Sequence, residues 1–191
     1  KPFVRYFVEG EHLMVDGKKM SKSLGNIYTL RDLAAKGFQP LDFRYFVLGA
    51  HYRTPLNFTW KALGAAQQAR IGLLNTVERI RRGPYGSHLT DETESLKVIA
   101  AAEAEFATAI ADDCNTPKGL AILAELLHYA NGMLDRKLFT ARASRALLIV
   151  LREFDHVLGL KLLERRKGGA PAEVQKPVAE RERHRRATRW A

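Results

Sequence analysis

Five consecutive residues near the start of the chain combine amine, hydroxyl and apolar groups in an order that suits phosphate chemistry. They are Lys19, Met20, Ser21, Lys22 and Ser23, here called the signature loop. The two ammonium groups, three residues apart, can both reach a triphosphate, and the serine hydroxyls can donate hydrogen bonds to phosphate oxygens. Gly25 lets the backbone turn close to such a ligand. The pattern predicts a loop that handles nucleotide phosphates, against the plainer alternative of a surface turn with two lysines.

Such a loop suits the attack of a carboxylate on the α-phosphorus of ATP. Negative charge then builds on the phosphoryl oxygens and on the departing pyrophosphate, so cations placed there stabilise the transition state more than the ground state. A loop can also close over ATP after the nucleotide has bound. The two lysines are the groups that would carry this charge.

The residues around the signature loop predict short elements that hold it. Leu13-Met14-Val15 reads as a strand stopped by the turn pair Asp16-Gly17, and a polar loop runs from Lys18 to Asn26. Thr29 with Asp32 three positions later resembles a capping box and predicts a short helix that ends at Gly37. Pro40 suits the first position of the next helix.

From Thr59 onward the apolar residues recur at helical spacing, which predicts four amphipathic helices in an antiparallel bundle. The first ends near Gly83-Pro84, the second lies before the break at 113–115, the third has Thr116 as N-cap, and the fourth runs from about Thr140 to Leu158. The residues expected to face inward include Trp60, Leu63, Leu74, Val77, Leu96, Ile99, Phe106, Ile110, Leu120, Leu123, Leu127, Ala130, Leu134, Leu147, Leu151, Phe154 and Leu158. Cys114, the only cysteine, is expected to be a small buried apolar residue, so neither a disulfide within the chain nor a cysteine cluster for zinc is expected.

The charge of the chain indicates a polyanionic partner. Its 191 residues carry 31 Lys and Arg against 21 Asp and Glu, a formal net charge of +10. Residues 161–191, which include a linker at 167–171, hold ten basic and four acidic side chains. This stretch is either an RNA-binding surface or a solvated basic tail. No apolar run is long enough to cross a bilayer, and no secretory leader precedes the first strand, so a cytoplasmic protein without a membrane partner is expected.

The signature loop followed by Leu24-Gly25-Asn26 resembles the second signature sequence of class I aminoacyl-tRNA synthetases. Its surroundings are similar to the cysteinyl branch of that family. The similar segments are 14–18, 44–46, 51–58 and 112–117, and the resemblance covers residues 1 to about 160. Beyond them, the Arg-rich residues 180–190 resemble the entry to the small anticodon-binding domain of the branch.

The resemblance implies an ATP-dependent activation of cysteine to cysteinyl adenylate, followed by transfer to tRNA(Cys). Lys22 would bind the triphosphate and stabilise the leaving pyrophosphate, with Lys19 as the second catalytic cation. Ser21 and Ser23 would assist at the ATP phosphates and Met20 would anchor the loop. The residues expected to contact tRNA are Arg53, Arg181, Arg183, Arg185, Arg186 and Arg189. For the run His51-Tyr52-Arg53, the alternative is a helix-to-helix corner held by packing, with Arg53 bonded to carbonyls.

The same resemblance implies parts that this chain lacks. The family uses a His-x-Gly-His motif to bind adenine, and none of the six histidines belongs to one. A zinc ion in the whole enzyme would hold the substrate thiolate through ligands outside this chain, and Mg²⁺ would accompany ATP. We therefore expect a C-terminal half, cut at both ends and inactive alone, of a parent that is monomeric.

These observations predict a mainly α fold. Residues 1–58 would form the end of a Rossmann-type catalytic domain with the signature loop, and residues 59–160 a tRNA-contacting helical bundle of the DALR type. Residues 161–191 would be a linker and the start of a basic anticodon-binding domain. Two alternatives stay open: a non-catalytic tRNA- or RNA-binding helical module, and a related cysteine ligase that acts on an amino-sugar amine.

Overall fold

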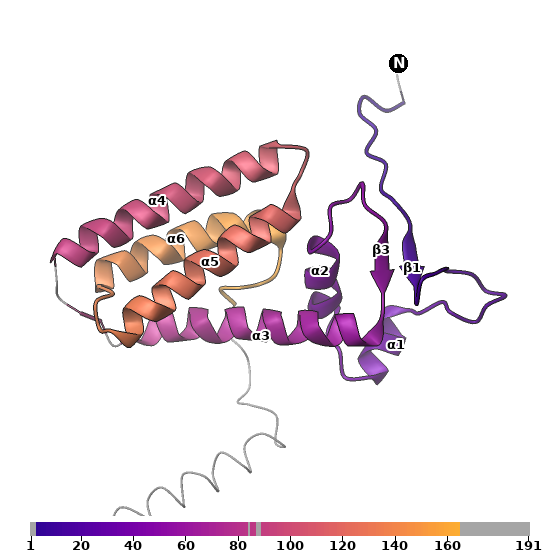
Figure 1. Cartoon of the computed structure of the whole chain (residues 1–191), viewed down its shortest axis with the longest axis horizontal. Helices are drawn as coiled ribbons and strands as arrows, with labels where there is room; N and C mark the ends of the chain where they lie inside the picture. Colours follow the sequence, from indigo (N-terminus) through magenta and orange to yellow (C-terminus); the bar gives the residue numbers. More distant parts are fainter. Residues whose placement is uncertain (1–2, 84, 87–88, 165–191) are drawn as a thin grey trace, which may run out of the picture.

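The computed structural model describes residues 3–83, 85–86 and 89–164, and it is mainly helical, as predicted. The elements are β1 (Leu13–Val15), β2 (Lys18–Lys19), α1 (Leu30–Ala35), α2 (Pro40–Leu48), β3 (Leu56–Phe58), α3 (Trp60–Arg82), α4 (Leu89–Ala111), α5 (Thr116–Asp135) and α6 (Ala141–Leu158). Figure 1 shows two parts: the strands with α1 and α2, here called the sheet unit, and the helical bundle of α3–α6. None of the described helices is long and apolar enough to span a membrane.

The sheet has the order β2-β1-β3, with β1 antiparallel to β2 and parallel to β3. The predicted strand and turn are confirmed: β1 ends at Val15, and Asp16 and Gly17 turn the chain with φ values of 49° and 73°. Two features were not predicted. Lys18 and Lys19 lie in a strand and not in a loop, and β3 forms in a segment where the sequence indicated only a helix-to-helix corner. Strands of two and three residues are too short to show alternation in a sequence.

Aromatic and aliphatic side chains form a small core under the sheet. Its buried members are Val15, Leu33, Phe58 and Leu63, with the rings of Tyr28 and Trp60 packed against Phe58. The predicted capping box at Thr29 is present, and Pro40 occupies the start of α2 as expected. These two short helices close the sheet unit on one side.

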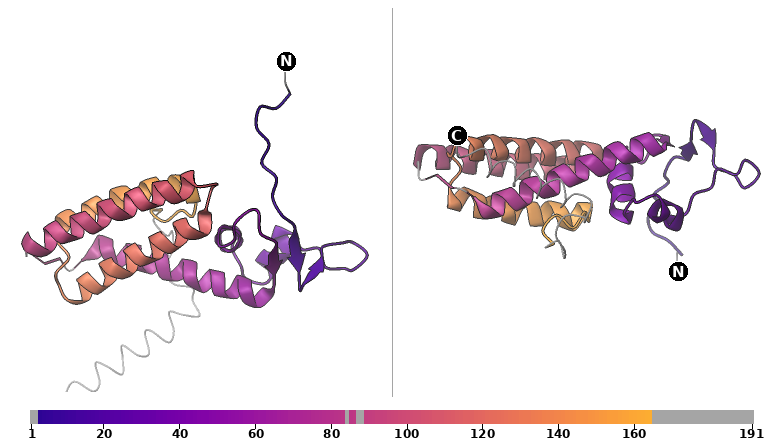
Figure 2. Two further views of the ribbon diagram at one scale, coloured as in Figure 1. Left: turned by 45° about the horizontal axis from the view of Figure 1, so that its top comes forward. Right: turned by 90° about the horizontal axis from the view of Figure 1, so that it is seen from below.

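Most of the apolar residues that were predicted to face inward are buried in the bundle, but Leu74, Leu96 and Ile110 are only half-buried. Two others, Trp60 and Leu63, belong to the core of the sheet unit. Consecutive helices from α3 to α6 run in opposite directions and lie side by side in the views of Figures 1 and 2. Leu123, Leu147 and Leu151 are fully buried, and the ring of Phe106 stacks on Phe154 with centroids 3.9 Å apart. The third helix begins differently from the prediction, because its N-cap is Asn115 and not Thr116.

Cys114 is exposed, which contradicts the expectation that it is buried. It lies in the turn between α4 and α5, where both Asp113 and Cys114 have a φ of 53°. This left-handed turn directs the cysteine side chain away from the bundle core. The apolar character of cysteine therefore gave a wrong prediction of burial for Cys114.

A buried ion pair joins the sheet unit to the bundle. The Asp42 carboxylate in α2 accepts hydrogen bonds from Arg70 Nε in α3 at 2.8 Å and from Gln67 Nε2 at 3.0 Å. The exposed fraction is 0% for the Asp42 side chain and 5% for that of Arg70. The backbone N–H of Gln39 also donates to this carboxylate, so both of its oxygens are bonded. Removal of either partner of such a pair would leave a buried charge without compensation.

Candidate functional site

The signature loop extends from the sheet unit into solvent between β2 and α1 (Figure 1). Lys19 ends β2, and Lys22 and Ser23 lie on the exposed part of the loop. Within the described residues, neither lysine takes part in an ion pair. Two cations are therefore accessible to an anionic ligand on one turn of the chain.

The side chain of Asn26 closes the loop on itself. Its Oδ1 accepts a hydrogen bond from the backbone N–H of Ser21 at 2.8 Å, and its Nδ2 donates to the carbonyl of Lys19 at 3.1 Å. Gly25 has a φ of 63° and donates its N–H to the carbonyl of Lys22 at 3.1 Å. Sequence reasoning assigned Asn26 no role, although its place after the glycine was a visible signal.

The two serines of the loop face one another. Ser21 Oγ lies 3.2 Å from Ser23 Oγ and also accepts a hydrogen bond from the N–H of Leu24 at 3.3 Å. Each hydroxyl can reorient its proton toward a phosphate oxygen. The loop is thus a small cluster of donors, with a backbone that is held by bonds within the loop.

Met20 packs against the small core of the sheet unit, while Lys19, Lys22 and Ser23 remain exposed. It lines an apolar cavity of about 150 Å³ behind the loop. The other lining residues are Leu13, Tyr28, Leu30, Leu33, Phe43 and Phe58. The thioether side chain can repack in a cavity of irregular shape, so the loop has an apolar attachment that tolerates movement.

β3 supports the hairpin that leads into the loop. The Asn57 side chain accepts a hydrogen bond from the N–H of Gly17 at 2.8 Å, and the Phe58 carbonyl accepts one from the N–H of Asp16 at 3.0 Å. The turn at 16–17 is thereby bonded to a strand from a distant part of the sequence. The position of the loop depends on where β3 lies.

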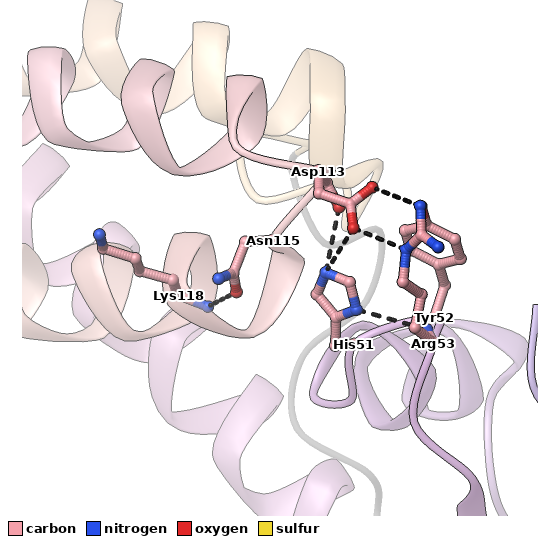
Figure 3. A network of polar contacts seen from close by, with 6 residues as sticks. All are labelled: His51, Tyr52, Arg53, Asp113, Asn115 and Lys118. Atoms are coloured by element: carbon pink, nitrogen blue, oxygen red, sulfur yellow. Dashed lines mark hydrogen bonds and ion pairs between the residues drawn. The ribbon is translucent and has the colours of Figure 1, made fainter.

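A second polar group, here called the Asp113 network, joins the segment before β3 to the bundle (Figure 3). Arg53 Nε donates to the Asp113 carboxylate at 2.7 Å, and Tyr52 OH donates to it at 2.5 Å. His51 Nε2 lies 3.1 Å from the Asp113 carbonyl oxygen. The expectation that Arg53 is bonded to carbonyls is wrong, because its partner is a carboxylate on the α4–α5 turn.

The hydrogen bonds of the Asp113 network shift the pKa values of two of its members. The hydrogen bond from Arg53, followed by that from Tyr52, lowers the pKa of the Asp113 carboxyl below its usual value. The pKa of Tyr52 is raised, chiefly by the same hydrogen bond to Asp113. At neutral pH the network therefore holds an aspartate and a neutral tyrosine.

Several residues predicted to act in binding lie outside the described part of the chain. They are Arg181, Arg183, Arg185, Arg186 and Arg189, and the linker at 167–171 lies outside it as well. Within the part of the chain that the structure describes, no group of three or more His, Cys, Asp or Glu side chains could hold a metal ion.

Comparison with known proteins assigns both parts of the molecule. Residues 1–68 match the family of tRNA synthetases class I (C) catalytic domains, and residues 105–163 match the DALR domain family. The catalytic match includes the signature loop, and the DALR match begins in α4 and includes the Asp113 turn. The part of the chain that carries the signature loop is therefore similar to class I tRNA synthetases.

Relatives that align with the whole chain include cysteine–tRNA ligases. Those of Chlamydia muridarum and Chlamydia felis are 39% identical to it over 198 and 193 residues. That of Protochlamydia amoebophila is 34% identical over 191 residues. The alignments cover 100% of this chain but 41%, 40% and 39% of these relatives.

Proposed function

We propose that this chain supplies the signature loop and the helical tRNA-binding region of a cysteine–tRNA ligase. The whole enzyme would join cysteine to ATP, forming cysteinyl adenylate and pyrophosphate, and would then transfer the cysteinyl group to tRNA(Cys). The observation that carries this proposal is the exposed pair of lysines on a supported loop, within a segment that matches class I catalytic domains. Relatives named cysteine–tRNA ligase along the whole chain support the choice of amino acid.

Each residue of the signature loop has a distinct task in this proposal. Lys22 binds the triphosphate and stabilises the charge on departing pyrophosphate, and Lys19 adds a second cation. Ser21 and Ser23 donate hydrogen bonds to phosphate oxygens. Met20 holds the loop to the sheet unit through its apolar contacts. The nucleotide substrate in this proposal is the complex of ATP with Mg²⁺.

The proposed tRNA contacts come from Arg53, in the segment between α2 and β3, and from the basic tail. Arg53 keeps 66% of its side chain exposed beside Asp113, which leaves room for a phosphate. The five tail arginines (181, 183, 185, 186 and 189) would meet the anticodon stem through phosphate contacts. The proposed division is a catalytic end at 1–58, the bundle at 59–160 and a basic anticodon-binding segment at 161–191.

The whole enzyme is proposed to be cytoplasmic and monomeric. The family resemblance adds a zinc ion, but the described residues contain no set of ligands that fits one. No step assigned to this chain therefore involves zinc.

The test replaces Lys22 by alanine in the full-length protein that contains this chain. We expect ATP–pyrophosphate exchange to fall at least about tenfold, because the variant removes a cation that stabilises the transition state. Binding of tRNA should remain. The matched control is Lys18→Ala, which removes an ammonium that is also exposed, from β2 outside the signature loop.

Equal exchange activity in wild type and Lys22→Ala would overturn the proposal and leave a non-catalytic RNA-binding module. Exchange that depends on Lys22 without charging of tRNA would point instead to a ligase that acts on an amino-sugar amine. The assays are pyrophosphate exchange with cysteine, and charging of tRNA(Cys).

A further inference from the structure

We propose that Asp113 is a positioning residue that fixes the α4–α5 turn of the bundle against the strand that supports the signature loop. In this way it sets where bound tRNA lies relative to the activated cysteine. The inference rests on the proposed function and concerns the transfer step, whereas Lys22 concerns the activation step.

Three consecutive side chains converge on this one aspartate from the segment after α2. Tyr52 and Arg53 donate to its carboxylate, and His51 contacts its carbonyl (Figure 3). The N–H of Arg53 donates to His51 Nδ1 at 3.3 Å, so this nitrogen is an acceptor. The neutral tautomer with the proton on Nε2 then donates to the Asp113 carbonyl, and all these bonds form together.

The same segment is bonded to the sheet that carries the signature loop. The Tyr52 carbonyl accepts a hydrogen bond from the N–H of Glu11 at 2.7 Å. The N–H of Leu56 donates to the His12 carbonyl at 3.2 Å, and Asn57 holds Gly17 of the hairpin turn. Hydrogen bonds and a short stretch of backbone therefore lead from Asp113 to the start of the loop.

The backbone of the α4–α5 turn adopts a costly conformation to present this carboxylate. Asp113 and Cys114 are consecutive residues with side chains at positive φ, a region that glycine occupies at lower cost. Strain of this kind persists where the surroundings impose it. Here the surroundings are the end of α4, where the N–H groups of Cys114 and Asn115 donate to the carbonyls of Ile110 and Ala109, and the side chains that bond Asp113.

Exposure indicates that the Asp113 network orients the two parts more than it stabilises them. The side chains of Arg53 and Asp113 are 66% and 45% exposed, and ion pairs this open add little to stability. The buried Asp42–Arg70 pair already joins α2 to α3. Loss of the outer network should therefore leave the fold intact while the α4–α5 end of the bundle moves.

The experiment compares Asp113→Asn with Asp112→Asn in the full-length protein. Both variants remove one negative charge from the same turn, but the Asp112 side chain has no hydrogen-bond or ion-pair partner among the described residues. We expect pyrophosphate exchange by Asp113→Asn to stay within about twofold of wild type, because Asp113 contacts no residue of the signature loop. The rate of transfer to tRNA should fall about tenfold, because misplaced reactants react slowly.

A second variant tests whether the network acts as one unit. Tyr52→Phe removes a single hydroxyl from the network, and it should lower transfer in the same direction as Asp113→Asn. The double variant should be less impaired than the product of the two single effects, because residues in one network are not additive.

Transfer by Asp113→Asn equal to that of Asp112→Asn would overturn the inference. A parallel loss of exchange, transfer and thermal midpoint would also overturn it, because it would show a structural role only. Failure of the proposed function appears elsewhere, as exchange that does not depend on Lys22, so the two failures are distinguishable.

Discussion

Gly86, in the connection between α3 and α4, is a single residue on which the packing of the bundle depends. Its N–H donates to the Phe139 carbonyl at 2.9 Å, and a Cβ at this position would lie 2.0 Å from the carbonyl oxygen of Lys137. Gly86 therefore lies directly against the connection from α5 to α6. Only a residue without a side chain fits there.

Gly86→Ala should lower the free energy of unfolding by about 1–3 kcal/mol, the usual range for overpacking. The matched control is Gly64→Ala in α3, where an added Cβ meets nothing within 4 Å. That change should raise stability by up to about 1 kcal/mol, because alanine favours a helix interior. Urea denaturation of both variants measures the difference, and an equal shift in both would contradict the explanation.

Motifs made of neighbouring residues could be predicted from the sequence. Contacts between residues that are far apart in the sequence could not. The signature loop and the capping box at Thr29 each lie within a few residues, so their patterns are visible in one stretch. The partners Arg53 and Asp113 are 60 residues apart, and no local period connects them. The N-cap of α5 is Asn115 and not Thr116. The left-handed turn at Asp113 and Cys114 ends one residue earlier than the position of Pro117 suggested.

At the scale of elements, α2 and α3 are held together by charge as well as by packing. Asp42 and Arg70 are both buried, and each needs the other to offset the cost of leaving water. The sequence predicted an amphipathic α3 but not its buried ion pair, because the pattern of apolar residues did not indicate where Arg70 would point. Long helices with a steady period were predicted well, whereas the short strand β3 depends on its partner β1 for its conformation.

Arg70→Met should lower the free energy of unfolding by about 3–5 kcal/mol, because the Asp42 carboxylate would stay buried without its cation. The double change Arg70→Met with Asp42→Asn removes both charges and should be less destabilising than the single change. Denaturation of the two single variants and the double variant measures the coupling. Strict additivity would show that the pair does not interact across the α2–α3 contact.

At the scale of the whole molecule, the net charge of +10 makes salt the natural probe of RNA binding. Replacing the tail arginines by glutamine in the full-length protein should weaken tRNA binding and flatten its dependence on salt. The slope of log Kd against log salt should fall by up to about 4, because each phosphate that is no longer neutralised lowers it by about 0.7–0.9. The residues replaced are Arg181, Arg183, Arg185, Arg186 and Arg189.

Arg142→Gln serves as the control for this measurement. It removes an exposed charge from α6, but this arginine is already paired with Glu92. The control should change the slope by less than about 1. A slope that the tail variant leaves unchanged would show that the arginines are only solvated.

One continuous helix belongs to both cores of the molecule. Leu63 of α3 is buried in the sheet unit, while Val77 and Ile80 of the same helix are buried in the bundle. With 23 residues at 1.5 Å each, α3 is a rod of about 34 Å. A tilt of about 10° about its first residue, Trp60, would carry its far end through about 6 Å. A tilt of α3 that hardly moves the signature loop would therefore displace the C-terminal end of this helix, inside the bundle, by about the height of one helical turn.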